Sequence, residues 1–92
     1  MNIIDLGRLR KIEIAVECAR EAITASVTYP PFNSVHEGYA IIKEEFDELW
    51  DIIKMKEQCR DNVQMRLEAI HLGAMAIRFI YDLLEKKGEN YG

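Results

Sequence analysis

The sequence predicts an all-α protein, and three observations lead to this prediction. Apolar residues recur at helical spacing in three long segments, no segment shows the strict alternation of a β-strand, and the two prolines stand together between the first two segments. The composition, 49% hydrophobic and 30% charged, is typical of a folded, helix-rich chain. We therefore expect residues 1–92 to form a single domain of three main helices, an antiparallel helical bundle that oligomerisation completes.

The first helix is expected over about residues 6–27. This segment has good helix formers, no proline and, after Gly7, no glycine. Apolar and small residues follow an alternating three-and-four spacing along it: Leu9, Ile12, Val16, Ala19, Ile23 and Ser26. The spacing predicts a long amphipathic helix, which Pro30 and Pro31 bring to an end because proline donates no backbone hydrogen bond.

The second helix is expected over about residues 35–56. The Ser-x-x-Glu sequence from Ser34 to Glu37 has the form of a capping box, in which both side chains accept hydrogen bonds from free amides at a helix start. Trp50 lies on the apolar side of this helix, so we expect it in the core.

The third helix is expected over about residues 63–85, with Asp61 or Asn62 as its N-cap and a loose tail at 88–92. Besides the apolar face around Met65, this helix has a second apolar strip nearly opposite: Ile70, Ala74, Ile77, Tyr81 and Leu84. A helix that is apolar on two sides is central in its domain or lies at a subunit contact. We therefore expect a homodimer or a homotetramer.

Charge and composition exclude several classes of function. A net charge of −4 opposes binding to a nucleic-acid polymer, which needs clustered Lys and Arg. No apolar stretch is long enough to cross a bilayer, so we expect a cytoplasmic protein without a membrane partner. Cys18 and Cys59 form no Cys-x-x-Cys pair, which favours two reduced thiols over a disulfide framework or a structural zinc site.

Glu45 is the most informative residue of the second helix. At about 100° per residue, its side chain falls inside the apolar arc, where an unpaired carboxylate is costly. Glu48 follows at the border of the arc, and residues three apart have Cβ atoms about 5–6 Å from one another. These two carboxylates can therefore share one cation. The other acids of the helix project from its polar side and are expected at the surface: Glu44, Asp47 and Asp51.

The third helix repeats this arrangement. Glu68 is embedded among apolar residues, and His71 follows three residues later at the border. Antiparallel packing of the second and third helices would bring Glu45, Glu48 and Glu68 together on the facing sides, with His71 beside them. Converging carboxylates of this kind indicate a metal site.

These motifs resemble the MazG-like all-α nucleoside triphosphate pyrophosphohydrolases, especially small phage-type members. The family signature is Glu-x-x-Glu on one helix and Glu-x-x-Asp on the next, and residues 45–48 and 68–71 occupy those places with 19 residues between them. The resemblance covers about residues 34–84, over half of the chain. It implies hydrolysis of a nucleoside triphosphate to a monophosphate and pyrophosphate.

The resemblance also implies which residues act. Mg²⁺, or Mn²⁺ in its place, would be held by Glu45, Glu48, Glu68 and His71, and would lower the pKa of a bound water. Glu48 and Glu45 are the expected catalytic residues, and the carboxylate that accepts the proton of the water is Glu48 or Glu44, a choice that the sequence leaves open.

Two features complete this interpretation. Lys54 and Arg78 are the expected phosphate-binding cations of the second and third helices. His71 stands where the family has an aspartate, and Mg²⁺ gains less from an imidazole than from a carboxylate. The alternative is therefore a noncatalytic helical oligomer, either a degenerate nucleotide-binding relative or an interaction module.

Overall fold

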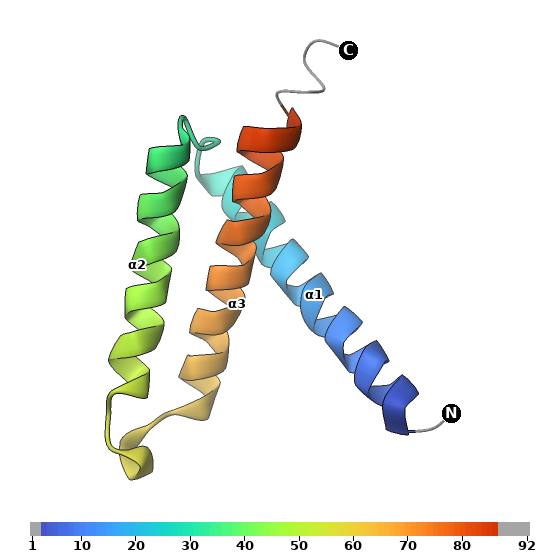
Figure 1. The fold of residues 1–92 in the computed structure, drawn as a ribbon, viewed down its shortest axis with the longest axis vertical. Helices are drawn as coiled ribbons and strands as arrows, with labels where there is room; N and C mark the ends of the chain where they lie inside the picture. The colour runs from blue at the N-terminus through green and yellow to red at the C-terminus, as the bar shows by residue number, and fades with distance from the viewer. Residues whose placement is uncertain (1–2, 87–92) are drawn as a thin grey trace.

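The protein is all-α, as the sequence predicts. The computed structural model describes residues 3–86, which contain no β-strand, and the expected tail at 88–92 lies outside the described residues. The helices are α1 (Ile3–Thr28), α2 (Val35–Ile53) and α3 (Asn62–Phe79), and α3 continues as a π-helical segment, Ile80–Glu85. α2 and α3 lie side by side and antiparallel, while α1 crosses α3 obliquely and its N-terminal half projects away from both (Figure 1).

Side-chain caps define the start of α2. The Ser34 hydroxyl accepts a hydrogen bond from the Glu37 amide at 3.1 Å, which confirms half of the predicted capping box. The Glu37 carboxylate accepts from the backbone amide of Asn33 at 3.4 Å and from its side-chain amide at 3.1 Å. The reciprocal hydrogen bond therefore goes to the residue before the N-cap.

The end of α2 and the start of α3 are also fixed by side chains. α2 ends at Ile53, three residues earlier than expected, and the Arg60 Nε donates to the Ile53 carbonyl oxygen at 2.9 Å. The chain then makes a short 3₁₀ turn, Glu57–Cys59. Asp61 caps α3 by accepting hydrogen bonds from the Val63 and Gln64 amides at 2.9 and 3.2 Å, so the first of the two predicted caps is the one used.

The core is small, and α3 lies at its centre between the other two helices. Its buried apolar members come from α1, the α1–α2 turn and α3: Ala22, Ala25, Phe32, Ala74, Met75 and Leu83. Gly38 of α2 allows a close approach to α3, because a Cβ at that position would lie 2.7 Å from the Phe79 ring. Gly73 does the same on the α1 side, where a Cβ would lie 2.7 Å from the Cys18 Sγ.

The packing face of α1 differs from its apolar stripe, and one expectation about the core is wrong. α1 packs on α3 through Cys18, Ala22 and Ala25, and the spaced apolar residues that the sequence shows along α1 lie on another side. Small side chains are used here because the two helices cross closely. Trp50 was expected in the core, but it is 54% exposed. No described helix combines the length and apolar character needed to span a membrane.

Candidate metal centre

Three of the predicted metal ligands converge between α2 and α3. The Glu45 Oε2 lies 3.9 Å from the His71 Nδ1, and the Glu68 Oε2 lies 3.7 Å from the same nitrogen. One ligand atom from each of the three residues falls within 4.8 Å of the other two. The antiparallel packing of α2 and α3 therefore produces the juxtaposition that the sequence predicts.

The two carboxylates are buried without full compensation. Glu68 is 8% exposed, and Gln64, one turn earlier on α3, donates from its Nε2 to the Glu68 Oε1 at 2.8 Å. The Oε2 atoms of Glu45 and Glu68 are buried and have no hydrogen-bond partner. Because a buried carboxylate oxygen is costly when unpaired, the two orphaned atoms fit a divalent cation bound between them.

The carboxyl pKa values reflect this crowding. Burial is the main cause that raises the pKa of Glu45, while the neighbouring His71 opposes the rise. Glu48 is exposed at the edge of the cluster, and its pKa is raised from 4.5 to about 7, mainly by hydrogen bonding to Glu68, then by burial and by the charge of Glu45. Glu48 is thus beside the other two carboxyls and competes with them for a proton or a cation.

Glu21, which no motif of the sequence marks as a site residue, reaches the cluster from α1. Its Oε1 lies 3.7 Å from the His71 Nε2, so His71 has carboxylates near both ring nitrogens. Glu21 follows Cys18 by three residues and precedes Ala25 by four, which places it on the packed face of α1. The small residues of that face were the only signal for it in the sequence.

A pocket of about 510 Å³ adjoins the cluster. Glu21, Glu45 and His71 line one part of it, and Arg78 lines another, two turns further along α3. Because two turns of α-helix rise about 11 Å, the pocket extends from the acidic cluster to a positive charge. Glu44, expected at the surface, also lines this pocket, although its side chain is exposed.

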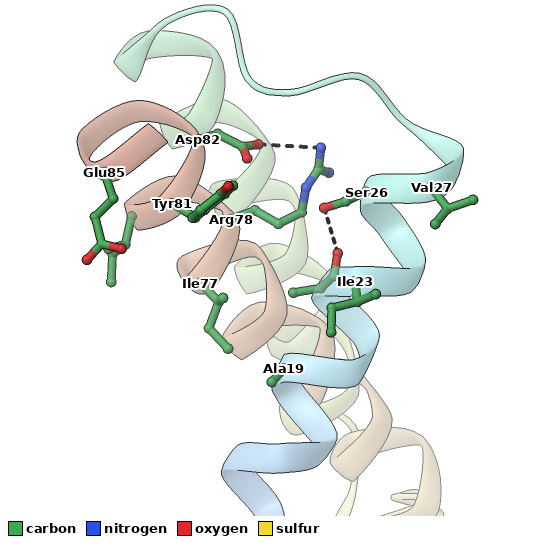
Figure 2. A pocket seen from close by; sticks show the side chains of 11 residues that line it. Ala19, Ile23, Ser26, Val27, Ile77, Arg78, Tyr81, Asp82 and Glu85 are labelled. Atoms are coloured by element: carbon green, nitrogen blue, oxygen red, sulfur yellow. Dashed lines mark hydrogen bonds and ion pairs between the residues drawn. The ribbon is translucent and has the colours of Figure 1, made fainter. Parts of the chain in front are cut away.

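Arg78 is buried and has structural partners of its own. Its Nη2 donates to the Pro30 carbonyl oxygen at 2.7 Å and lies 3.7 Å from the Asp82 Oδ2 (Figure 2). The guanidinium also stacks on the Phe32 ring, 4.6 Å from its centroid, while the Arg78 Nε is buried without a hydrogen-bond partner. Arg78 therefore holds the α1–α2 turn against α3 and still lines the pocket.

The structure does not bring Lys54 to the cluster. It lies at the C-terminal end of α2 and forms an exposed ion pair with Asp51 at 2.9 Å. Asp47 is likewise at the surface and pairs with Lys43 at 2.9 Å, as expected for the polar side of α2. Of the two predicted phosphate-binding cations, only Arg78 adjoins the pocket.

The arrangement of His71 suits a metal ligand. If its Nδ1 binds the cation, its Nε2 faces the Glu21 carboxylate, which can orient the ring and raise its basicity. The comparison of the chain with protein-family models, curated proteins and solved structures found no match. The chemistry of the site therefore rests on its own residues: a buried carboxylate (Glu68), a half-buried one (Glu45), an imidazole, two carboxylates at the edge and an arginine in the pocket wall.

Proposed function

We propose that the protein is a metal-dependent nucleoside triphosphate pyrophosphohydrolase, as its resemblance to the MazG-like family implies. The observation that carries the proposal is the pair of buried, unpartnered oxygens, Glu45 Oε2 and Glu68 Oε2, which two antiparallel helices present beside His71. The adjoining pocket supplies room for a polyphosphate, and Arg78 lies in its wall with its charge already paired with Asp82.

In this proposal Glu45, Glu68 and His71 hold the cation and Glu48 acts as the base. The cation, Mg²⁺ or Mn²⁺, would supply charge compensation for the phosphates and lower the pKa of a water. Glu48 would accept a proton from the attacking water, whose oxygen forms a bond to phosphorus as the bond between the α- and β-phosphates breaks to leave a monophosphate and pyrophosphate. The pKa of Glu48 is raised to about 7 in the metal-free protein, and a cation at the neighbouring carboxylates would lower it and keep Glu48 deprotonated.

The ligand set favours Mn²⁺ over Mg²⁺. Mg²⁺ prefers oxygen ligands, whereas Mn²⁺ accepts an imidazole nitrogen more readily. His71 takes the place of the aspartate of the family signature, so we expect faster turnover with Mn²⁺ than with Mg²⁺.

The same residue supports a second candidate function. A site in which His71 weakens Mg²⁺ binding can hold a nucleoside triphosphate without cleaving it, which is the degenerate relative that the sequence leaves open. Both candidates are cytoplasmic proteins. Both also include self-association as a homodimer or a homotetramer, because all three helices leave large apolar side chains exposed.

Pyrophosphate release tests the proposal. Purified protein is incubated with a panel of ribonucleoside and deoxynucleoside triphosphates in Mg²⁺ and in Mn²⁺. We expect release with at least one substrate, a loss on the order of 100-fold or more in Glu68→Gln, and little change in the matched surface variant Asp47→Asn. No pyrophosphate release with any substrate in either metal would contradict the proposed enzymatic activity. Measured binding of a triphosphate would then support the noncatalytic nucleotide-binding protein.

A His71→Asp variant adds a separate test of the ligand set. If the imidazole limits Mg²⁺-dependent turnover, the variant releases pyrophosphate faster with Mg²⁺ and loses its preference for Mn²⁺. An unchanged ratio of the two rates would show that His71 does not select the metal.

A further inference from the structure

The spaced residues of α1 form a stripe that the described chain leaves mostly exposed, with only Ala19 half-buried. Every residue from Leu6 to Val16 is exposed, and the stripe continues along the helix as Leu9, Ile12, Val16, Ala19, Ile23 and Ser26. Ile12 is 60% exposed and Ile23 is 65% exposed. The three-and-four spacing over almost three heptads is that of a coiled-coil face, which is stable only when a second helix packs on it.

A groove of about 620 Å³ lies beside the C-terminal half of this stripe. Ile23 and Val27 of α1 form one wall, and Ile77, Ile80 and Tyr81 of α3 and its π-helical continuation form the other (Figure 2). The lining is almost entirely apolar, and Val27 is 85% exposed. The groove therefore extends the stripe onto α3 and gives it room for an apolar helix.

The order of residues in the stripe allows it to pack against the same stripe of a second chain that runs in the antiparallel direction. An antiparallel coiled coil pairs the first core position of one heptad with the second core position of the other helix. A two-fold axis between Val16 and Ala19 places Leu9 opposite Ser26 of the partner subunit, Ile12 opposite Ile23 of the partner subunit, and Val16 opposite Ala19 of the partner subunit. All six positions are then used, and the pairing spans about 26 Å of helix.

The charges beside the stripe fit the same pairing. Glu13 and Arg20 each follow a core position, Ile12 and Ala19, so they lie on one flank of the stripe. In the antiparallel register Glu13 of one copy lies next to Arg20 of the partner subunit, and the two-fold axis makes this contact twice. In a parallel pairing, Glu13 would instead lie at the same height as Glu13 of the partner subunit, and Arg20 at the same height as Arg20 of the partner subunit. Glu13 is 3.9 Å from Arg10, but this pair is exposed and weak enough to be exchanged.

We infer that a second copy of this chain covers the α1 stripe in an antiparallel, two-fold arrangement. The projecting N-terminal half of α1 from each copy lies on the C-terminal half of the other α1 and fills the groove against α3. Two such groove contacts and the helix pair form one continuous patch of the kind that can supply the roughly 800 Å² per partner of a stable interface. The inference uses no residue of the metal centre and does not depend on the proposed activity.

The mass of the protein in solution tests this inference. Light scattering after size-exclusion chromatography measures the molar mass. At protein concentrations up to about 100 times those of routine assays, the wild type should have the mass of an even number of chains. Ile12→Asp places a charge in the stripe and should halve that mass. Thr24→Asp adds the same charge at an exposed position of α1 that lies neither on the stripe nor on the face packed against α3, and should keep the mass and the helical circular dichroism of the wild type.

A charge exchange tests the register independently of folding. Glu13→Arg and Arg20→Glu each bring like charges together and should raise the dissociation constant about tenfold or more. The double variant restores opposite charges and should return the dissociation constant to within about threefold of the wild type. A monomeric wild type, equal dissociation by Ile12→Asp and Thr24→Asp, or a double variant as weak as the singles would each overturn the inference.

Discussion

Glu68 shows at the scale of one residue how the site is arranged. Its backbone lies in the middle of α3, where α2 covers it. One carboxylate oxygen accepts from Gln64, and the other is buried without a hydrogen-bond partner, 3.7 Å from the His71 Nδ1. Buried carboxylate oxygens are normally hydrogen-bonded. The proposed cation would supply the missing partner, and Gln64 would fix the orientation of the carboxylate.

Replacing Gln64 tests this orienting role. Gln64→Leu keeps the volume of the side chain but removes the Nε2 donor, so Glu68 can rotate away from His71. We expect Mn²⁺ affinity to fall about 10-fold or more, since partners of this kind typically contribute 10- to 100-fold. Calorimetric titration with Mn²⁺ measures it, and Gln58→Leu, an exposed glutamine of the 3₁₀ turn, is the control. Equal affinities in the two variants would rule out the role.

The raised pKa of Glu48 predicts that the stability of the fold depends on pH. Its folded pKa of about 7 lies above the ordinary value of 4.5, so the folded state binds the proton more tightly than the unfolded state. In EDTA this contribution to stability is complete below about pH 4.5 and is lost as the pH rises through about 7. Glu48→Gln should remove that loss, as measured by thermal unfolding from pH 5 to 8. A wild type that gains stability relative to the variant over this range would contradict the assignment.

Added Mn²⁺ should reverse the loss of stability that rising pH causes in EDTA. Mn²⁺ binds the deprotonated carboxylates, so its stabilising effect should grow between pH 5.5 and 8 in the wild type. The comparison uses the Mn²⁺-induced rise in Tm at the two pH values. A rise that is larger at the lower pH would be incompatible with binding at these carboxylates.

At the scale of elements, the π-helical end of α3 and the α1–α2 turn depend on one buried ion pair. Arg78 is 4% exposed and Asp82 is 8% exposed. Arg78 donates to the Pro30 carbonyl oxygen, and the Asp82 Oδ2 accepts from the Phe32 amide at 3.2 Å. The turn contains adjacent prolines and cannot satisfy these backbone groups itself, so the two side chains do so.

Breaking this pair should destabilise the fold. Arg78→Met keeps most of the apolar stem but leaves Asp82 and the Pro30 carbonyl without their partner, a loss of about 3 kcal/mol in the free energy of unfolding. Urea denaturation measures it. Arg66→Met removes an exposed pair with Glu17 and should have little effect. Equal losses in the two variants would show that the buried pair does not hold the turn.

The helix contacts make opposite predictions for two glycines. Gly38→Ala introduces a Cβ 2.7 Å from the Phe79 ring, so overpacking outweighs the gain in helix propensity and we expect a net loss of about 1 kcal/mol. Gly7→Ala in α1 meets no atom within 4 Å and should stabilise the protein by about 0.5–1 kcal/mol. Chemical denaturation compares the two. A stabilising Gly38→Ala would show that α2 and α3 are not in close contact there.

At the scale of the whole molecule, the sequence predicts what depends on local order and misses what depends on how helices cross. Ser34 and Asp61 cap the helices they were expected to cap, since capping involves residues only two or three positions away. Glu45 and Glu68 face each other because helical periodicity and antiparallel packing suffice to place them.

The misses have one physical origin. α1 packs through small residues because its crossing with α3 is close, and apolar spacing alone points to the larger residues of the other side. The approach of Glu21 to His71 and the pairing of Arg78 with the Pro30 carbonyl, 48 positions away, follow from that crossing. The small residues of the packed face of α1 are a weak signal for Glu21, and the Arg78 contact has none in the local sequence.

We propose that α2 and α3 together hold one divalent cation at Glu45, Glu68 and His71. Mn²⁺ binding can be followed by the loss of the electron paramagnetic resonance signal of the free ion. We expect one tight site per chain in the wild type and none in Glu68→Gln, with Asp47→Asn as the unchanged control. Wild-type protein that binds no Mn²⁺ more tightly than Glu68→Gln does would contradict it.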